Sequence, residues 1–313
     1  MITTKEQNQK LFIITGAGGL IGHKLALQVS RLGYAAIVHT RIPKKWESDH
    51  LIPVAGDLTE STVRKKLFDV SDSFKNQETI FIHLAATNDV RRANSDPVRA
   101  FNTNVALTAQ LAIAVAQKES SRFIYASSGG IYNPSANTLL SEKDLPKPAS
   151  IYAASKLAAE SFLQGLATER KLPCDILRLS NAYAPESPEN SVIGRILKQV
   201  RCRQPIQVMD TTPVRDFIFI EDIVEGFLRI SELPPETNCT ITNLSTGTGT
   251  SIGEVLNIIK KISGAQILPP SEDEHYNYLV LANDLLQART GWKPTTSLHN
   301  GLFKCLKEIH NKP

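Results

Sequence analysis

Tyr152 and Lys156 stand four residues apart in the segment Y-A-A-S-K. On a helix, this spacing places both side chains on one face. A phenol has an ordinary pKa of about 10 and is a poor base at neutral pH, but a neighbouring ammonium group stabilises the phenolate and lowers that pKa. Such a pair could exchange a proton with a substrate hydroxyl or carbonyl. The same spacing also occurs on ordinary helix faces, so other features have to support this interpretation.

A pair of serines provides the second feature. Ser127 and Ser128 follow a short apolar run in Y-A-S-S-G-G-I-Y. They are expected at the carboxyl end of a strand, where open α/β sheets build their sites. A hydroxyl there can hydrogen-bond a reacting oxygen, whereas a simple serine-rich turn is the alternative.

A glycine-rich turn provides the third feature. The first apolar run ends in T-G-A-G-G-L-I-G, which places Gly16, Gly19 and Gly22 between a strand and a helix. Glycines there permit a tight turn, close approach of a phosphate and close helix–strand packing. The helix N-terminus adds free N–H groups and a partial positive charge. The pattern predicts a dinucleotide site.

Residues after the second and third strands bear on which dinucleotide binds. A carboxylate after the second strand would accept hydrogen bonds from the adenosine ribose, but Thr40 is neutral and Arg41 is cationic. An arginine fork suits a 2′-phosphate, which favours NADP over NAD; a solvated basic loop is the alternative. Asp57 follows the third strand and could bind the adenine amino group or cap the next helix.

These groups need a framework that brings them together. Apolar runs predict strands over 11–15, 35–39, 52–55, 79–83, 122–126 and 175–179. Helical patterns cover 20–32, 60–68, 98–117, 152–169, 220–230 and 252–262. Alternating strands and helices indicate an α/β fold whose parallel sheet is covered on both faces. We expect a dinucleotide-binding domain over 1–178, to which 215–245 returns, and a smaller mixed substrate-binding domain over 179–214 and 246–313.

Composition narrows the class of protein. The net charge of +4 across 313 residues is too weak to indicate nucleic-acid binding. No apolar run reaches about 18 residues, so no membrane span is expected, and the polar N-terminus lacks the core of a secretory signal. The four cysteines form no C-x-x-C pair, which argues against a metal or disulfide role. A cytoplasmic protein with reduced thiols is expected.

Many motifs together resemble one family, the extended short-chain dehydrogenases/reductases, in the group of nucleotide-sugar epimerases and dehydratases. They are T-G-A-G-G-L-I-G, G-D-L at 56–58, H-L-A-A at 83–86, N-T-N-V-A-L-T, Y-A-S-S-G-G-I-Y, Y-A-A-S-K, L-R-L-S-N-A-Y-A-P, V-R-D-F-I-F-I-E-D-I and G-W-K-P. The resemblance implies a Rossmann-type doubly wound sheet with a smaller C-terminal substrate domain. It also implies a homodimer paired through the helices near 98–117 and 152–169.

The resemblance assigns roles to individual residues. Ser128 would be the catalytic serine, Tyr152 the acid/base, and Lys156 the residue that holds the ribose and tunes Tyr152; Asn104 would support the active-site helix. The implied cofactor-binding residues are Gly16, Gly19, Leu20, Ile21, Gly22, Arg41, Asp57, Leu58, Leu84, Ala85, Ala86, Asn104, Tyr152 and Lys156. The implied substrate-binding residues are Thr87, Ser128, Asn181 and Arg215; an ion pair with Asp216 or Asp222 is the alternative for Arg215.

The residues after Ser128 restrict the reaction. A 4,6-dehydratase of this group carries an acidic pair there, but this chain has Gly129 and Gly130, which can neither protonate a leaving group nor remove a proton. A reductase of a 4-keto nucleotide-sugar and a 4-epimerase of UDP-hexoses remain. Reductases of this kind use NADPH and epimerases hold NAD, so Thr40 and Arg41 favour the reductase. A sensor that binds the dinucleotide without chemistry is a third hypothesis.

Overall fold

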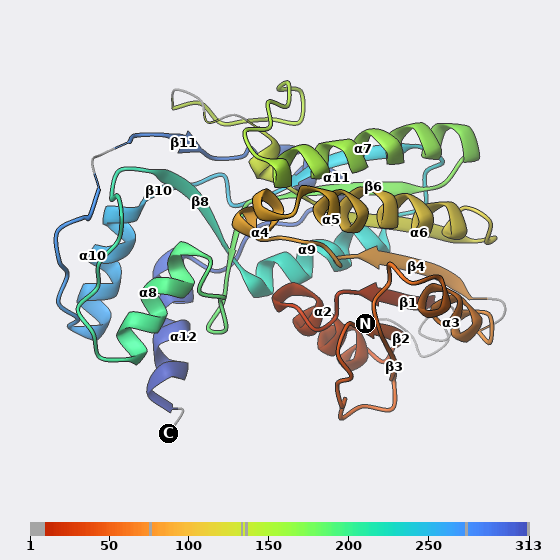
Figure 1. The fold of residues 1–313 in the computed structure, drawn as a ribbon, viewed down its shortest axis with the longest axis horizontal. Coiled ribbons are helices and arrows are strands. Elements are labelled where there is room, and N and C mark those ends of the chain that lie inside the picture. The colour runs from red at the N-terminus through yellow and green to blue at the C-terminus, as the bar shows by residue number, and fades with distance from the viewer. Residues whose placement is uncertain (1–9, 75–76, 133, 135–136, 273–274, 312–313) are drawn as a thin grey trace. The chain divides into compact units, whose positions relative to one another are not determined.

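The computed structural model describes residues 10–74, 77–132, 134, 137–272 and 275–311 (Figure 1). The chain divides into two units. The first comprises the residues up to 131 together with 148–178 and 227–242, and the second comprises 132–147, 179–226 and the residues from 243 onward. The return to the first unit is thus 227–242, because 214–219 pairs within the second unit instead.

The first unit is built on a seven-stranded sheet with the order β3-β2-β1-β4-β5-β6-β9. Its strands are β1 (Lys10–Thr15), β2 (Ala35–Thr40), β3 (Leu51–Ala55), β4 (Glu78–His83), β5 (Ser121–Ser128), β6 (Cys174–Leu179) and β9 (Cys239–Leu244). The pairs β1–β2, β2–β3, β1–β4 and β4–β5 are parallel. The strand order reverses between β1 and β4, and in open α/β sheets ligands bind at the carboxyl ends beside such a reversal.

Helices connect these strands. They are α2 (Leu20–Arg31), α3 (Ser61–Ser71), α4 (Val90–Ser95), α5 (Pro97–Phe101), the π-helical turn η1 (Asn102–Ala106), α6 (Leu107–Val115), the 3-10 turn η2 (Gly129–Ile131), α7 (Ile151–Arg170) and α9 (Ile220–Glu232). The α/β doubly wound architecture predicted from the alternating pattern is confirmed.

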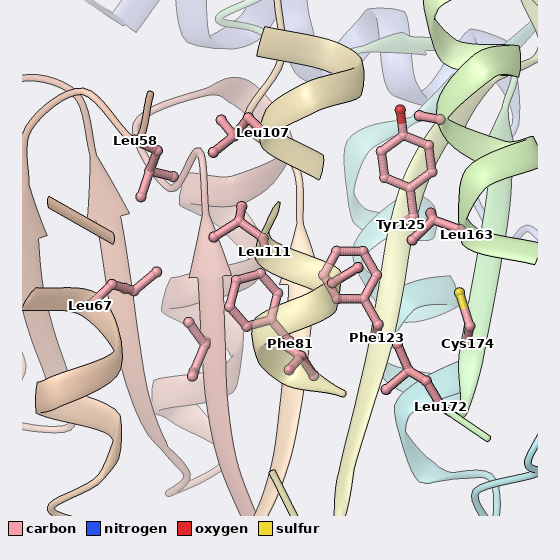
Figure 2. Close-up of a cluster of buried hydrophobic side chains, with 14 of the residues drawn as sticks. Leu58, Leu67, Phe81, Leu107, Leu111, Phe123, Tyr125, Leu163, Leu172 and Cys174 are labelled. Atoms are coloured by element: carbon pink, nitrogen blue, oxygen red, sulfur yellow. The ribbon is translucent and has the colours of Figure 1, made fainter. Parts of the chain in front are cut away.

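Alternate side chains of each strand point to opposite sides of the sheet. Consecutive residues of the strands are buried, so both faces of the sheet are covered. Leu11 and Ile13 belong to a cluster with residues of α6 and α7, while the intervening Phe12 and Ile14 are equally buried. Figure 2 shows the cluster side, where Phe81 and Phe123 stack with centroids 5.3 Å apart. This packing fixes α7, and so Tyr152 and Lys156, against β5.

The helix predicted over 98–117 is not continuous. The structure has α5, then η1, then α6. A π-helical turn accommodates one extra residue, and such turns are frequent at functional sites. Here it carries Asn104, whose buried side chain bonds to the backbone of Thr87 and to Ser155. These tertiary hydrogen bonds explain the interruption, which the apolar pattern did not reveal.

The second unit has a smaller mixed sheet. Its strands are β7 (Asn181–Tyr183), β8 (Val214–Phe219), β10 (Gly249–Ser251) and β11 (Tyr278–Leu279), and its helices are α8 (Val192–Arg201), α10 (Ile252–Ser263), α11 (Asp284–Thr290) and α12 (Leu298–Asn311). The central strand β8 pairs antiparallel with β10 and parallel with β7 and β11. The mixed character predicted for this part is confirmed.

Across the described residues, no helix combines the length and the apolar character that crossing a membrane requires.

Candidate active site

The glycine turn between β1 and α2 forms a cradle that side chains would fill. Gly16 has φ +72°, a left-handed conformation that favours glycine, and a Cβ there would lie 2.8 Å from the amide nitrogen of Ala85. A Cβ on Gly22 would lie 2.4 Å from the carbonyl oxygen of Gly16. Gly19 is the N-cap of α2 and brings no capping side chain. The turn therefore fits a pyrophosphate held by backbone N–H groups.

The edge beyond β2 presents cations and one carboxylate. The Thr40 hydroxyl is buried and donates to the Ile42 carbonyl (2.7 Å), whereas Arg41 is exposed. Hydrogen bonds from the backbone N–H and hydroxyl of Thr59 lower the pKa of Asp57, and the charges of Arg41 and Arg99 lower it further. The N-cap of α3 is Glu60. Asp57 therefore organises the turn before that helix and remains an ionised acceptor.

Tyr152, Lys156 and Ser128 meet where α7 packs on the end of β5. The helix begins after Ser150, whose hydroxyl accepts from the Ala153 N–H. Lys156 is only 4% exposed, and its Nζ donates to the Ala126 carbonyl at 2.7 Å. The Ser128 hydroxyl lies beside the Tyr152 phenol and acts to lower the pKa of that phenol. The structure thus brings the three predicted catalytic residues together in the first unit.

The electrostatics of this pair differ from the expectation that Lys156 holds the phenol acidic. Burial raises the pKa of Tyr152 above its ordinary value, and the hydrogen bond with Ser128 opposes this. Burial lowers the pKa of Lys156 to about 7, with the charge of Glu160 acting in the opposite direction. Desolvation disfavours the charged form of both groups. The expectation is therefore wrong for the protein alone, in which the phenol is protonated at neutral pH.

Asn104 supports α7 through direct hydrogen bonds. Its side-chain carbonyl accepts from the Thr87 N–H (2.7 Å), and its amide donates to the Thr87 carbonyl (3.1 Å) and the Ser155 hydroxyl (2.9 Å). Ser155 in turn donates to the Tyr152 carbonyl (2.7 Å). Asn104 therefore joins the loop after β4, which holds Leu84, Ala85 and Ala86, to the N-terminal part of α7 that carries Tyr152.

His83 is a buried structural residue. Its Nδ1 lies 2.7 Å from the Thr15 hydroxyl and its Nε2 lies 3.0 Å from the Thr108 hydroxyl. The Thr108 hydroxyl donates to the Asn104 carbonyl, so Nε2 donates to Thr108 and Nδ1 accepts from Thr15. Burial and the charge of Lys156 lower the pKa of His83 to about 3. A neutral, fully bonded imidazole fits the packing role expected from the sequence.

A cavity of about 390 Å³ lies in the second unit. Asn181 and Arg215, both predicted to bind substrate, line it together with Arg195 of α8, which sequence reasoning missed. Nη1 of Arg215 donates to the carbonyls of Val214 (2.8 Å) and Asn277 (3.2 Å). The cavity therefore places two guanidinium groups beside an amide, a donor set suited to phosphate oxygens.

The ion pair considered for Arg215 does not form. The Asp216 carboxylate accepts from Ser180, Thr246 and Gly247, and the Asp222 carboxylate accepts from the residues at 295–296. Among the described residues, no carboxylate lies within ion-pair distance of the Arg215 guanidinium. Backbone carbonyls hold it at the cavity instead.

The fold and the site define a class of protein, an enzyme that uses a nicotinamide dinucleotide. The chain belongs to the NAD dependent epimerase/dehydratase family, whose model matches residues 12–243. The resemblance stated from the motifs is thereby confirmed.

Individual relatives agree with this assignment. A putative UDP-glucose 4-epimerase of Methanocaldococcus jannaschii is 27% identical over 311 residues, covering 96% of this chain and 99% of that protein. UDP-glucose 4-epimerase of Mycolicibacterium smegmatis is also 27% identical, covering 96% of this chain and 98% of that protein. The solved structure of MoeE5 in complex with UDP-glucuronic acid and NAD superposes with a TM-score of 0.85 at 25% identity, covering 97% of this chain and all of that one.

Proposed function

We propose that this protein is a 4-epimerase of UDP-hexoses that holds NAD. The observation that carries the proposal is the grouping of Ser128, Tyr152 and Lys156 with glycines at positions 129 and 130. That group can move a proton and orient a carbonyl but has no second acid or base for water elimination. The named relatives favour epimerisation over the reductase reaction that Thr40 and Arg41 suggested.

Three residues would have distinct roles in the proposed epimerisation. Tyr152 takes the proton from the sugar O4 and returns it, while the Ser128 hydroxyl orients that oxygen. Lys156 is fixed by the Ala126 carbonyl, and its ammonium would bind the ribose of the cofactor. When bound, NAD supplies reversible hydride transfer and, in its oxidised form, a positive charge that favours phenolate.

The nucleotide would bind in the cavity of the second unit. Arg195 and Arg215 would hold the diphosphate, and Asn181 would contact a phosphate or the sugar. A guanidinium group can bind phosphate oxygens through two hydrogen bonds, which orient the nucleotide-sugar and also contribute to its affinity.

A reductase remains the second candidate because of one observation. The end of β2 has the exposed Arg41 and no carboxylate at Thr40, a combination that suits the 2′-phosphate of NADP. With NADP, one hydride would be delivered to a 4-keto sugar in each turnover.

A single assay separates the two functions. Incubated with UDP-glucose, the protein is expected to form the C4 epimer without net change in absorbance at 340 nm, because the hydride returns to the same sugar. Arg41→Asp is expected to leave this activity unchanged within about threefold and to weaken any NADP binding by at least about tenfold. Stoichiometric loss of NADPH with a 4-keto sugar, and no epimer, would establish the reductase instead.

We further propose that the protein is a homodimer. Helix α7 packs against α4, α5 and α6 (Figure 1). These helices leave large apolar side chains exposed, including Val98 (70%) and Phe101 (53%) on α5 and Phe162 (39%) on α7. Exposed apolar side chains gathered on neighbouring elements are typical of an interaction surface.

Phe162→Glu is expected to convert the dimer to monomer in sedimentation-velocity experiments, because it would bury a charge at the interface. Phe303→Glu, at an exposed phenylalanine on α12 (51%), is the matched control and should leave the dimer intact. A wild-type chain that sediments as a monomer would contradict the proposal.

A further inference from the structure

A buried ion pair lies beside the proposed catalytic group. Glu160 is 0% exposed and Arg178 is 3% exposed. Nη2 of Arg178 donates to one carboxylate oxygen of Glu160 at 2.7 Å, and Nε lies 3.2 Å from both oxygens. The pair joins α7 to β6, and the reaction proposed above uses neither residue.

The same carboxylate is also bonded to β5. The Ser127 hydroxyl donates to Oε1 of Glu160, and Ser127 directly precedes Ser128. In α7, Glu160 lies one turn after Lys156 and two turns after Tyr152, on the same face. Glu160 is therefore the point at which β5, β6 and α7 are joined, one turn from Lys156 and bonded to the residue that precedes Ser128.

The charges around Lys156 single out Glu160. His83 of β4 is neutral, since its pKa is about 3, and burial raises the pKa of Tyr125 of β5, whose ring lies 4.6 Å from Nζ. On α7 itself, Tyr152 is protonated. Arg178 of β6 forms an ion pair with Glu160. The negative charge of Glu160 favours the ammonium form of Lys156.

We propose that the Glu160–Arg178 pair is a positioning device: through Ser127 it fixes Ser128 at the end of β5, and through α7 it keeps the Lys156 ammonium aligned with the Tyr152 phenol. This inference rests on the proposed function, because it assigns the pair to the same proton exchange.

The test uses Glu160→Gln, which keeps the shape and an oxygen acceptor but removes the charge. Turnover is expected to fall by about tenfold or more, with KM changed less than about threefold, because misalignment acts on the reacting geometry. The fall in turnover on the alkaline side is expected to move to lower pH by about one pH unit, because removing a carboxylate lowers the pKa of a neighbouring ammonium. The full-length protein with its cofactor is used throughout.

The molecule contains a matched control. Arg122 and Asp175 form an equally buried pair, also at 2.7 Å, at the opposite ends of the same two strands. Asp175→Asn removes a buried charge of the same kind far from Lys156. This substitution should lower thermal stability. It should not shift the pH at which turnover falls on the alkaline side, and it should change turnover per folded molecule by less than about twofold.

A titration that needs no turnover separates this inference from the proposed function. With lysine labelled by ¹³C at Cε, the Lys156 resonance, assigned by its loss in Lys156→Arg, should titrate at lower pH in Glu160→Gln than in the wild type. It should titrate unchanged in Asp175→Asn. If the wild type shows no epimerase activity, the proposed function fails while this measurement still decides the coupling of Glu160 to Lys156.

Two further variants decide the matter if Glu160→Gln does not fold. Ser127→Ala keeps the ion pair and should lower turnover without shifting the Lys156 titration, whereas Glu160→Asp keeps the charge and should leave the Lys156 titration at its wild-type pH. The inference is overturned if Ser127→Ala has wild-type turnover, if folded Glu160→Gln has the wild-type titration, or if Asp175→Asn reproduces the shift.

Discussion

Tyr152→Phe is expected to lower the turnover number by about 10²–10⁴-fold, the usual contribution of a positioned proton-exchange group. The ring remains in place, so the hydrogen bonds from the Ser155 hydroxyl to the Tyr152 carbonyl and from Lys156 Nζ to the Ala126 carbonyl are kept. Affinity for NAD should change by less than about threefold, because the glycine cradle is untouched. Initial rates of epimer formation and a cofactor-binding titration measure the two quantities.

Tyr125→Phe is the matched control for this experiment. Tyr125 is a second buried tyrosine of the same neighbourhood, and its ring lies against Lys156. Removing its hydroxyl takes away no group that can reach a sugar oxygen in the proposed reaction, so turnover should remain within a few-fold of wild type. Equal turnover in Tyr152→Phe and wild type would remove Tyr152 from the reaction.

The pKa shifts explain why the effect should depend on the cofactor. In the protein alone, burial raises the pKa of Tyr152 and lowers that of Lys156 to about 7. The lysine cation is thus present below about pH 7 and is lost as the pH rises through that value. In the proposed reaction, proton exchange at Tyr152 would therefore depend on the further positive charge of oxidised NAD, because the ammonium of Lys156 alone does not lower the pKa of the phenol.

The parallel sheet could be predicted because its strands are apolar on both faces. Runs such as 11–15 and 79–83 contain little besides apolar residues, and the structure extends each by one residue. The candidate catalytic residues could be named from the sequence because a strand end, a glycine turn and the Tyr152–Lys156 spacing each have a local signature. Their meeting at one edge is a consequence of parallel topology, in which carboxyl ends coincide.

Other parts depend on tertiary contacts that leave no periodic signal. The π-helical turn at Asn102–Ala106 interrupts a continuous apolar pattern only because Asn104 finds hydrogen-bond partners on a loop and on α7. Glu160 belongs to no motif that the sequence offers, and its position as a buried charge follows from its ion pair with Arg178 of β6. A buried carboxylate is recognised only once its partner on a distant strand is known.

The second unit was the least predictable for a related reason. Its strands β7, β10 and β11 are two or three residues long, too short for alternation to be read. Helix α8, which carries Arg195, was missed although half of its residues are apolar, because the prolines around it dominated the pattern. Arg215 was found only because the V-R-D-F motif resembles the family position.

Replacing Arg215 by methionine is expected to raise the dissociation constant of UDP by about 10–100-fold, because a hydrogen bond to a charged group contributes about 1.5–3 kcal/mol. The guanidinium is fixed by the carbonyls of Val214 and Asn277 at the cavity wall, so the charge is already oriented before a phosphate arrives. Turnover at saturating UDP-glucose should change by less than about fivefold, since the lost contact is made equally in ground and transition states.

Lys198→Met is the control that distinguishes direct contact between Arg215 and UDP from long-range electrostatic attraction of UDP by the second unit. Lys198 lies on α8, pairs with Glu189 at 2.7 Å, and is absent from the cavity wall. Its removal lowers the net charge of the second unit by the same amount as Arg215→Met. Isothermal titration with UDP should therefore show near wild-type affinity for Lys198→Met. If both variants weakened UDP binding equally, and the loss disappeared at high salt, the arginine would act only through long-range attraction, because screening removes that term and spares a buried contact.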